Sequence, residues 1–284
     1  MLTLTGALIH VTRGSAWLLP ALALHGVVLD FLFCAEHETV HRTAFASRAL
    51  NDAIAWVCGL LLLLPPEYFR LFHFAHHRHT QDYARDPELG LAPPRRLRTY
   101  LWRATGLPNW WDRTTITLRH ALTGTVPEPF VPPAERAAVV REARLFWTLY
   151  AAVFVGSGLL RRPEPFFYWV IPALLGQPFL RLYLMAEHTG CGFHDNVYAN
   201  TRTIHTNALV RLIAWQMPYH IEHHAYPSVP FHALRALHRL IRARIEVSAP
   251  GYFAFHRTLI RDLRTQAALA RPDAAAIPTA ERPR

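Results

Sequence analysis

Lysine is absent from this chain: all 30 Lys-plus-Arg positions are arginine, against 20 Asp and Glu residues. The formal charge of +10 could suit nucleic acid, but the chain has no basic helix, finger or aromatic–basic motif to support that partner. A membrane protein with positively charged cytoplasmic segments explains the charge better. The arginine bias, with abundant Ala, Pro and Leu, also indicates a bacterial source with a GC-rich genome. We therefore expect a membrane and no nucleic acid as partner.

Cysteine is scarce, and the three present, Cys34, Cys58 and Cys191, form no C-x-x-C pair. The chain thus lacks the ligands of an iron–sulfur cluster or zinc finger and the pairs of a disulfide framework. A dinucleotide-binding glycine fingerprint and a His-Pro-Gly-Gly haem motif are also missing. No Ala-x-Ala-like site follows the apolar stretch after Arg13, so we expect no cleavable signal peptide.

Long apolar runs are present, and 51% of the residues are hydrophobic. The runs expected to cross a bilayer as helices lie near 15–35, 146–160 and 167–186. The last two flank a short link and predict a transmembrane hairpin. A shorter run, 53–64, is closed by Pro65-Pro66.

Histidines gather in three clusters: His37-Glu-Thr-Val-His41, His73-Phe-Ala-His76-His77 and His220-Ile-Glu-His223-His224. Spacings of three and four residues place side chains on one face of a helix. Imidazole is a ligand for iron, zinc, copper and nickel, and a zinc ion usually takes only four ligands. Eight clustered imidazoles therefore predict two metal ions, and two irons that activate O2 fit that number.

A shared metal centre requires the three clusters to lie on one side of the membrane. A hairpin over 146–186 returns the chain to its starting side, whereas a crossing at 53–64 would separate the first two clusters. We therefore expect 53–64 to be re-entrant, interfacial or buried, which suits its short length. The run 15–35 is then a single crossing, with the N-terminus on the far side from the histidines.

The set H-x-x-x-H, H-x-x-H-H, H-x-x-H-H resembles the membrane fatty acid desaturase and hydroxylase superfamily over about residues 15–245. Asp86-Pro87-Glu88 and Met217-Pro-Tyr, which flank the second and third clusters, are similar to the same family. The resemblance implies an all-α integral membrane domain over 1–265, with a cytoplasmic histidine-rich helical cap that holds two Fe2+ ions. Together with the composition, it leads us to expect a bacterial inner membrane, crossed several times. The composition of 266–284 predicts a disordered tail.

The resemblance also implies a ninth histidine outside the clusters, and Glu187-His188, directly after 167–186, matches its position. The expected metal ligands are His37, His41, His73, His76, His77, His188, His220, His223 and His224. His194 and His205 are weaker alternatives for the ninth ligand. Carboxylates should orient these imidazoles by accepting their other N–H. The candidates are Asp30, Glu38, Asp82, Asp86, Glu187 and Glu222, of which Glu38 and Glu222 are favoured because they lie within clusters.

Desaturation and hydroxylation both begin with removal of hydrogen from an unactivated C–H bond, and placement of the substrate carbon decides between them. We favour O2-dependent desaturation of a lipid-like acyl chain, because the residues around the second cluster resemble those of desaturases. The alternative is hydroxylation or ketolation of an alkyl, carotenoid or small amphiphilic substrate. An external ferredoxin, rubredoxin or haem carrier, with its reductase, is the implied electron donor, and an arginine-rich face could dock it.

The first cluster also matches H-E-x-x-H, the zinc protease motif in which Glu38 would be the general base. A membrane zinc protease is therefore a remote alternative, which leaves the six histidines of the other clusters unexplained. A non-catalytic metal store or transporter would place histidines within crossing helices or in flexible tracts. The clusters lie instead just outside the apolar runs.

Overall fold

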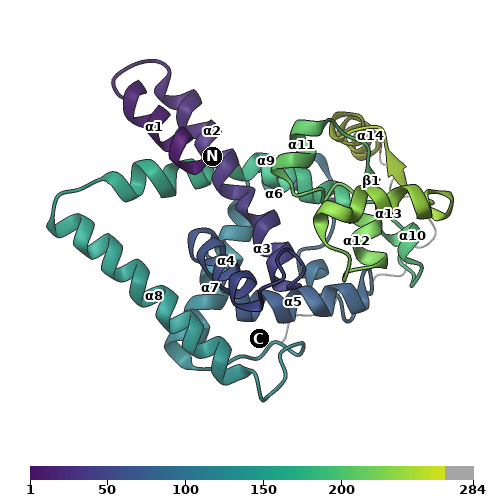
Figure 1. Ribbon diagram of the computed structural model, residues 1–284, viewed down its shortest axis with the longest axis horizontal. Helices are drawn as coiled ribbons and strands as arrows, with labels where there is room; N and C mark the ends of the chain where they lie inside the picture. Colours follow the sequence, from purple (N-terminus) through teal and green to yellow (C-terminus); the bar gives the residue numbers. More distant parts are fainter. Residues whose placement is uncertain (266–284) are drawn as a thin grey trace.

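A computed structural model describes residues 1–265, which are mostly helical (Figure 1). Two segments are long and apolar enough to cross a membrane. One joins α2 (Leu18–Asp30) to α3 (Leu32–Val40), and the other joins a π-helical turn, η2 (Phe166–Val170), to α9 (Ile171–His188). Each has 23 residues, about 34 Å of helix. The predicted mostly helical fold is confirmed, and the tail 266–284 lies outside the described residues.

The two candidate spans cross at a pair of glycines. A Cβ on Gly26 would lie 1.9 Å from the carbonyl oxygen of Pro172, and one on Gly176 would lie 2.2 Å from that of Gly26. Backbones can approach this closely only without side chains, as is common where membrane helices pack. His25 is hydrogen-bonded at this end of α2, with Nδ1 2.6 Å from Thr5 Oγ1 in α1 (Leu2–Thr12) and Nε2 3.1 Å from the Tyr168 carbonyl.

The run 53–64 lies in α4 (Arg48–Leu62), which is followed after a 97° bend by α5 (Pro66–His79). Leu63 takes a left-handed conformation (φ 54°) and Pro66 opens the next helix, so the chain turns abruptly. Three side chains donate to carbonyls of the last α4 turn: Tyr150 to Leu60 at 2.7 Å, Trp169 to Leu61 at 2.7 Å and Arg113 to Leu62 at 3.3 Å. The last carbonyl groups of α4 thus find their hydrogen-bond donors within the protein.

The run 146–160 forms the second half of α8 (Arg136–Leu159), which packs on α7 (Leu107–Thr123) and α5. Four of its first nine residues are charged, and α8 is not among the two helices that qualify as spans by length and composition. Near the linker, the rings of Phe154 and Trp169 stack with centroids 5.8 Å apart. Beyond it, α8 and α9 diverge, so the hairpin is an open one (Figure 1).

The remaining elements are short. They are η1 (Pro87–Gly90), α6 (Leu97–Ala104), α10 (Val197–Asn200), β1 (Thr203–Ile204), α11 (Ala208–Ile213), α12 (His220–Ala225), η3 (Phe231–Ala233), α13 (Leu234–Ile241), η4 (Arg242–Arg244), β2 (Ser248–Ala249) and α14 (Tyr252–Thr265). β1 and β2 pair in parallel. A buried core that includes Phe33, Phe69, Tyr183, Met217 and Leu234 joins α13 and the segment just before α12 to the ends of the two candidate spans.

Candidate metal centre

All nine histidines predicted as ligands converge, and they divide into two neighbouring groups. The first group is His37, His41, His73, His77 and His223, and the second is His76, His188, His220 and His224. Within each group, one ring nitrogen of every member lies within 4.8 Å of the others. Neither His194 nor His205 belongs to these groups.

Helix geometry explains how two H-x-x-H-H clusters serve both groups. Residues four apart on a helix point within about 40° of each other, whereas the residue three along points about 60° to the other side. On α5, His73 and His77 join the first group and His76 joins the second. On α12 the roles are exchanged, because His220 and His224 join the second group and His223 joins the first. The two helices therefore connect the groups.

The other three histidines lie at the ends of the candidate spans. His37 lies in the last turn of α3 and His41 follows directly, while His188 is the last residue of α9. Both spans therefore run toward the histidine groups and end beside them.

The spacing of the imidazole nitrogens fits metal ions. His73 Nε2 lies 2.8 Å from His41 Nε2 and 3.0 Å from His77 Nε2, and His188 Nε2 lies 3.0 Å from His220 Nε2. A neutral imidazole has a single N–H, so one nitrogen facing two others is poorly satisfied by hydrogen bonds alone. Adjacent ligand atoms about 2.1 Å from a six-coordinate cation would be about 3.0 Å apart. An all-imidazole donor set of this kind suits iron, zinc, copper or nickel.

Burial favours the neutral form of most imidazoles outside the candidate spans, as metal binding requires. His76 differs, because Glu88 and Asp86 outweigh its burial and raise its pKa. Burial lowers the pKa of His41 to about 4 from an ordinary value of 6.5. Burial, reinforced by the neighbouring imidazoles, holds the pKa values of His220, His223 and His224 well below that value. Their unprotonated nitrogens are therefore available as ligands near pH 7.

Asp86 accepts the second N–H of a grouped histidine, with its Oδ1 2.9 Å from His76 Nδ1. The carboxylate is itself held by the backbone N–H groups of Gln81 at 2.8 Å and Glu88 at 3.0 Å. Burial alone would raise the pKa of Asp86, but the hydrogen bond from His76 and these backbone bonds outweigh it and lower the pKa. Asp86 therefore stays ionised and fixes the ring of His76.

Two other grouped histidines also have partners for the ring nitrogen that faces away from the group. His220 does not, because Glu187 Oε1 lies 3.6 Å from its Nδ1, too far for a hydrogen bond. The Asn200 carbonyl lies 3.2 Å from His188 Nδ1, and Thr80 Oγ1 lies 3.2 Å from His224 Nδ1. Sequence reasoning missed Thr80 and Asn200, because a hydroxyl and a backbone carbonyl carry no motif.

Four other acids singled out in the sequence have different partners. Glu38 accepts from Thr43 Oγ1 at 2.7 Å and from the Phe231 N–H at 3.0 Å. Glu222 accepts from Thr203 Oγ1 at 2.7 Å and from His238, which is not a grouped histidine. Asp82 pairs with Arg85 on the surface, and Asp30 is buried beside Gly176 in the crossing of α2 and α9. Within residues 1–265, no hydrogen bond joins these four acids to a grouped histidine.

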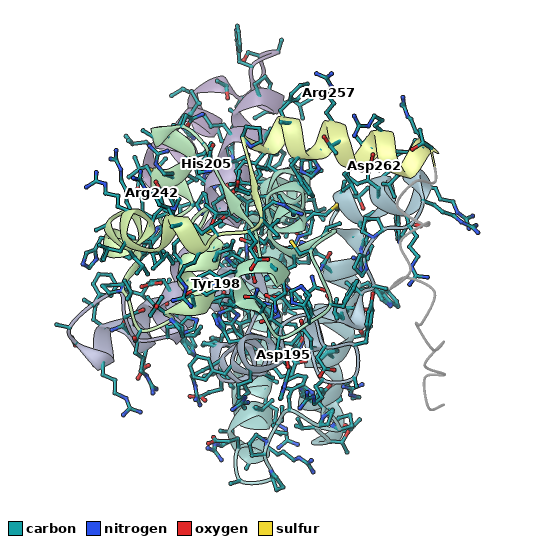
Figure 2. The ribbon with its side chains drawn as sticks, turned by 90° about the vertical axis from the view of Figure 1, so that its right-hand side faces the viewer. Asp195, Tyr198, His205, Arg242, Arg257 and Asp262 are labelled. Carbon is teal, nitrogen blue, oxygen red and sulfur yellow. The ribbon has the colours of Figure 1, made fainter. Side chains whose placement is uncertain are left out.

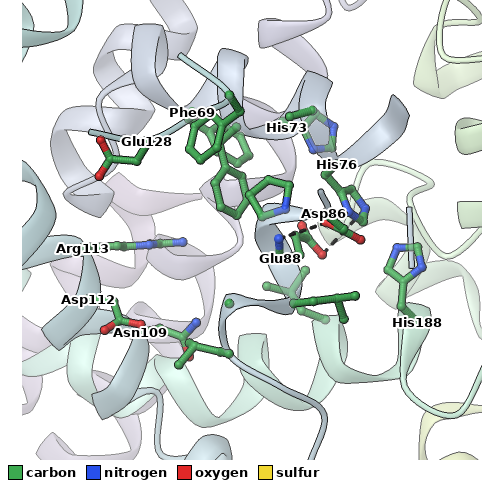
Figure 3. A pocket seen from close by; sticks show the side chains of 18 of the residues that line it. Phe69, His73, His76, Asp86, Glu88, Asn109, Asp112, Arg113, Glu128 and His188 are labelled. Carbon is green, nitrogen blue, oxygen red and sulfur yellow. Dashed lines mark hydrogen bonds and ion pairs between the residues drawn. The ribbon is translucent and has the colours of Figure 1, made fainter. Parts of the chain in front are cut away.

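A cavity of about 950 Å3 opens onto both groups, since His37, His73, His76, His188 and His220 line it. Its wall is apolar next to the histidines, where Phe33, Phe69, Phe72, Leu184 and Met185 lie. Figure 3 shows His76, Asp86, Glu88 and His188 on one side of the cavity and Asn109, Asp112 and Arg113 on the other. A ligand in the cavity would thus contact both histidine groups and a charged wall.

Glu88 is a cavity residue that sequence reasoning gave no role. Its Oε2 lies 3.7 Å from His76 Nε2, the ring nitrogen opposite the one bonded to Asp86. The signal that could have found it is its place two residues after Asp86, in the 3-10 turn whose first N–H Asp86 caps. Glu38, by contrast, does not line the cavity, which disfavours its role as the general base of a zinc protease.

Comparisons with known proteins agree with this geometry. The fatty acid desaturase family model matches residues 15–256. A dihydrorhizobitoxine desaturase of Bradyrhizobium elkanii is 27% identical over 262 residues, covering 84% of this chain and 70% of its own. An sn-1 oleoyl-lipid 12-desaturase of Synechocystis (24% identical, 82% and 69% covered) and a sphingolipid delta(4)-desaturase of Drosophila melanogaster (25%, 80% and 67%) are also similar. The chain belongs to the fatty acid desaturase family and is an oxidoreductase.

Proposed function

We propose that this protein introduces a double bond into a lipid-like acyl chain, using O2 and two iron ions held by the nine grouped histidines. The observation that carries the proposal is the pair of histidine groups, five and four, that share one cavity. A single metal ion could not use nine imidazoles, and iron is among the metals that an all-imidazole site suits. Hydroxylation or ketolation of a similar substrate is the second candidate, because it needs the same groups.

The reaction can be written as R–CH2–CH2–R′ + O2 + 2 electrons + 2 protons giving R–CH=CH–R′ + 2 H2O. Two C–H bonds break, the substrate loses two electrons, and O2 is reduced to water. When bound, the irons would supply the activation of O2 and the removal of hydrogen. Since the chain has no cofactor motif of its own, an external ferredoxin, rubredoxin or haem carrier supplies the other two electrons.

The protein's own residues would place the chain and exclude water. The ring of Phe69 stacks on His73 with centroids 5.5 Å apart, and Phe33 and Phe72 continue the apolar wall. An apolar wall beside the histidines holds methylene groups near the reacting position and keeps solvent away. Asp86 keeps the ring of His76 in place.

The direction of the two candidate spans determines the topology that we propose. Both end beside the histidines, so the chain must cross back once between residues 41 and 165. α8 suits this crossing because its 24 residues span about 36 Å and its later residues expose Val153, Val155 and Leu159. The bent pair α4–α5 would be re-entrant, and the N-terminus would lie on the far side of a bacterial inner membrane. The arginine-rich, histidine-bearing side would be cytoplasmic.

The electron donor would dock on α13 and η4. Arg235, Arg239, Arg242 and Arg244 are exposed there, and Figure 2 faces the side of the molecule on which Arg242 lies. The hydrogen bond from His238 to Glu222 joins α13 to α12, which carries three grouped histidines. An acidic carrier on this face would be attracted by the arginines and would lie close to both histidine groups.

Product analysis tests the proposed function. The protein is produced in a bacterial host with a reduced-ferredoxin supply, and its lipids and small molecules are compared with those of hosts carrying His76→Ala, His223→Ala or the control His205→Ala. His76 and His223 belong to different groups, whereas His205 is exposed. A new double bond with wild type and the control, but not with the first two variants, supports desaturation. A new hydroxyl or ketone supports the second candidate, and unchanged products with His76→Ala and His223→Ala contradict both.

A further inference from the structure

Arg113 and Arg181 are two of the six arginines that line the cavity. Arg113 comes from α7 and Arg181 from α9. Arg181 is 8% exposed, and its Nε and Nη2 have no hydrogen-bond partner. Carboxylates act on both guanidinium groups through their charge: Glu36 and Asp30 on Arg113, and Asp30, Glu88 and Glu187 on Arg181. Arg181 therefore brings unused N–H donors to the cavity, whereas Arg113 donates one N–H to the Leu62 carbonyl.

Arg119, Asp30 and Glu36 are other charged side chains in or near this region. Arg119 also lines the cavity but pairs with Glu128. Asp30 and Glu36, two buried acids on α2 and α3, do not line the cavity. The Nε and Nη2 donors of Arg181 nevertheless have no hydrogen-bond partner, although Glu88 and Glu187 line the same cavity. A buried guanidinium with unused N–H groups is costly, and a carboxylate is the group that matches its planar fork.

The position of Arg181 on α9 sets the distance between the carboxylate of a bound substrate and the carbons beside the histidines. Arg181 and His188 are seven residues apart, nearly two turns, so they lie on the same face of the helix about 10 Å apart along its axis. An extended chain advances about 3.6 Å for every three bonds, so 10 Å corresponds to roughly eight or nine bonds. A carboxylate at Arg181 would place a carbon eight or nine bonds away beside the histidines.

Building on the proposed function, we propose that Arg113 and Arg181 bind the free carboxylate of the substrate. The substrate class is then a medium-length or longer carboxylic acid that enters the cavity whole, with its reacting carbons eight or nine bonds from the carboxylate. An acyl chain esterified to a lipid has no such charge to place there. Phe69 and Phe72 would flank the methylene groups between the two ends.

Calorimetric titration of the purified, iron-loaded protein with decanoate and with methyl decanoate tests this site. We expect decanoate to bind about tenfold tighter or more, because only the acid can pair with the guanidinium groups. Arg181→Gln and Arg113→Gln should each remove that preference, while Arg181→Lys should keep part of it. The matched control is Arg144→Gln, since Arg144 donates to the Ala121 carbonyl and does not line the cavity. Unchanged iron content in each variant shows that the fold is intact.

Equal binding of acid and ester by the wild type would overturn the carboxylate site. The site would also be wrong if Arg181→Gln and Arg113→Gln bind decanoate as Arg144→Gln does while retaining iron. Should the protein desaturate esterified chains and show no acid preference, the carboxylate site fails and the proposed function stands. If it prefers decanoate but forms an alcohol from it, the site stands and the desaturase assignment fails.

Discussion

Asp86 has the most clearly defined contacts of any single residue near the histidine groups. Its Oδ1 accepts a hydrogen bond from His76 Nδ1, and two backbone N–H groups donate to the carboxylate. We expect Asp86→Asn to weaken iron binding by about 10- to 100-fold, because an amide is a poorer acceptor and does not fix the ring. Iron titration of the metal-free protein measures this. Asp82→Asn is the control, since Asp82 pairs with Arg85 on the surface, and equal affinities in the two variants would refute the role.

His41 makes the metal-free protein sensitive to acid. Burial lowers its pKa to about 4 in the folded state, whereas an unfolded chain takes up the proton near 6.5. Between these values the unfolded state holds more protons, so stability falls as pH falls. Thermal unfolding of the metal-free protein should show a constant midpoint above about pH 7 and a decline from about pH 6.5 toward pH 4. A midpoint that rises on acidification would contradict the buried, neutral state of this ring.

Sequence spacing was enough to find the eight clustered histidines, because three- and four-residue spacings are visible in the chain. His188 needed the resemblance, since a single histidine after an apolar run has no spacing of its own. The carboxylates could be predicted only partly. Glu38 and Glu222 lie within clusters but point away from the groups, toward Thr43 and Thr203. Which way a helical side chain points depends on the packed neighbours, and these come from distant segments.

At the level of elements, the bend between α4 and α5 depends on side chains from elsewhere in the chain. The short length of 53–64 and Pro65-Pro66 predict a break, and the structure has a 97° bend. What the sequence does not reveal is how the last carbonyls of α4 are satisfied, because their donors Arg113, Tyr150 and Trp169 lie at least 50 residues away.

Tyr150→Phe tests that arrangement with little change of shape. The Tyr150 hydroxyl donates to the Leu60 carbonyl at 2.7 Å, so its loss leaves a partly buried acceptor without that donor. We expect a loss of about 1–3 kcal/mol of stability, measured by denaturant unfolding in detergent. Tyr83→Phe, at an exposed tyrosine, should be nearly neutral. If the two variants are equally stable, this bond does not hold the end of α4.

The division into five and four histidines is also a property of elements. A helix with an H-x-x-H-H cluster must direct its middle histidine away from the outer pair, so two such helices facing each other create two adjacent groups. The sequence therefore contains the basis of a double site. Which helix supplies its pair to which group follows only from the packing of α5 against α12.

For the whole molecule, the strongest constraint is that both candidate spans end at the histidines. If α8 provides the return crossing, then Ser15 and Arg162 lie on one side of the membrane, and Asp52 and Asp195 lie on the other. Each of these residues, changed to Cys, can be labelled in intact spheroplasts with a membrane-impermeant maleimide. We expect labelling of Ser15→Cys and Arg162→Cys before lysis, and of Asp52→Cys and Asp195→Cys only after it. The three native cysteines are buried, which keeps the background low.

Labelling of Arg162→Cys only after lysis would exclude α8 as a crossing. The prediction from sequence was a hairpin over 146–186, and the length of α8 allows it, although its charged first turns do not resemble a membrane span. The cavity, in contrast, had no counterpart in the sequence. Its walls come from α5, α7, α9 and η1, and only the packed fold brings them together.

The most direct test of the metal centre is the iron content of the purified protein, measured by mass spectrometry together with protein concentration. Two histidine groups predict two irons per chain in the wild type. His41→Ala changes the five-histidine group and His224→Ala the four-histidine group, so each should lower the iron content toward one. A wild-type protein with one zinc and no iron, or with two irons retained in both variants, would contradict the assignment.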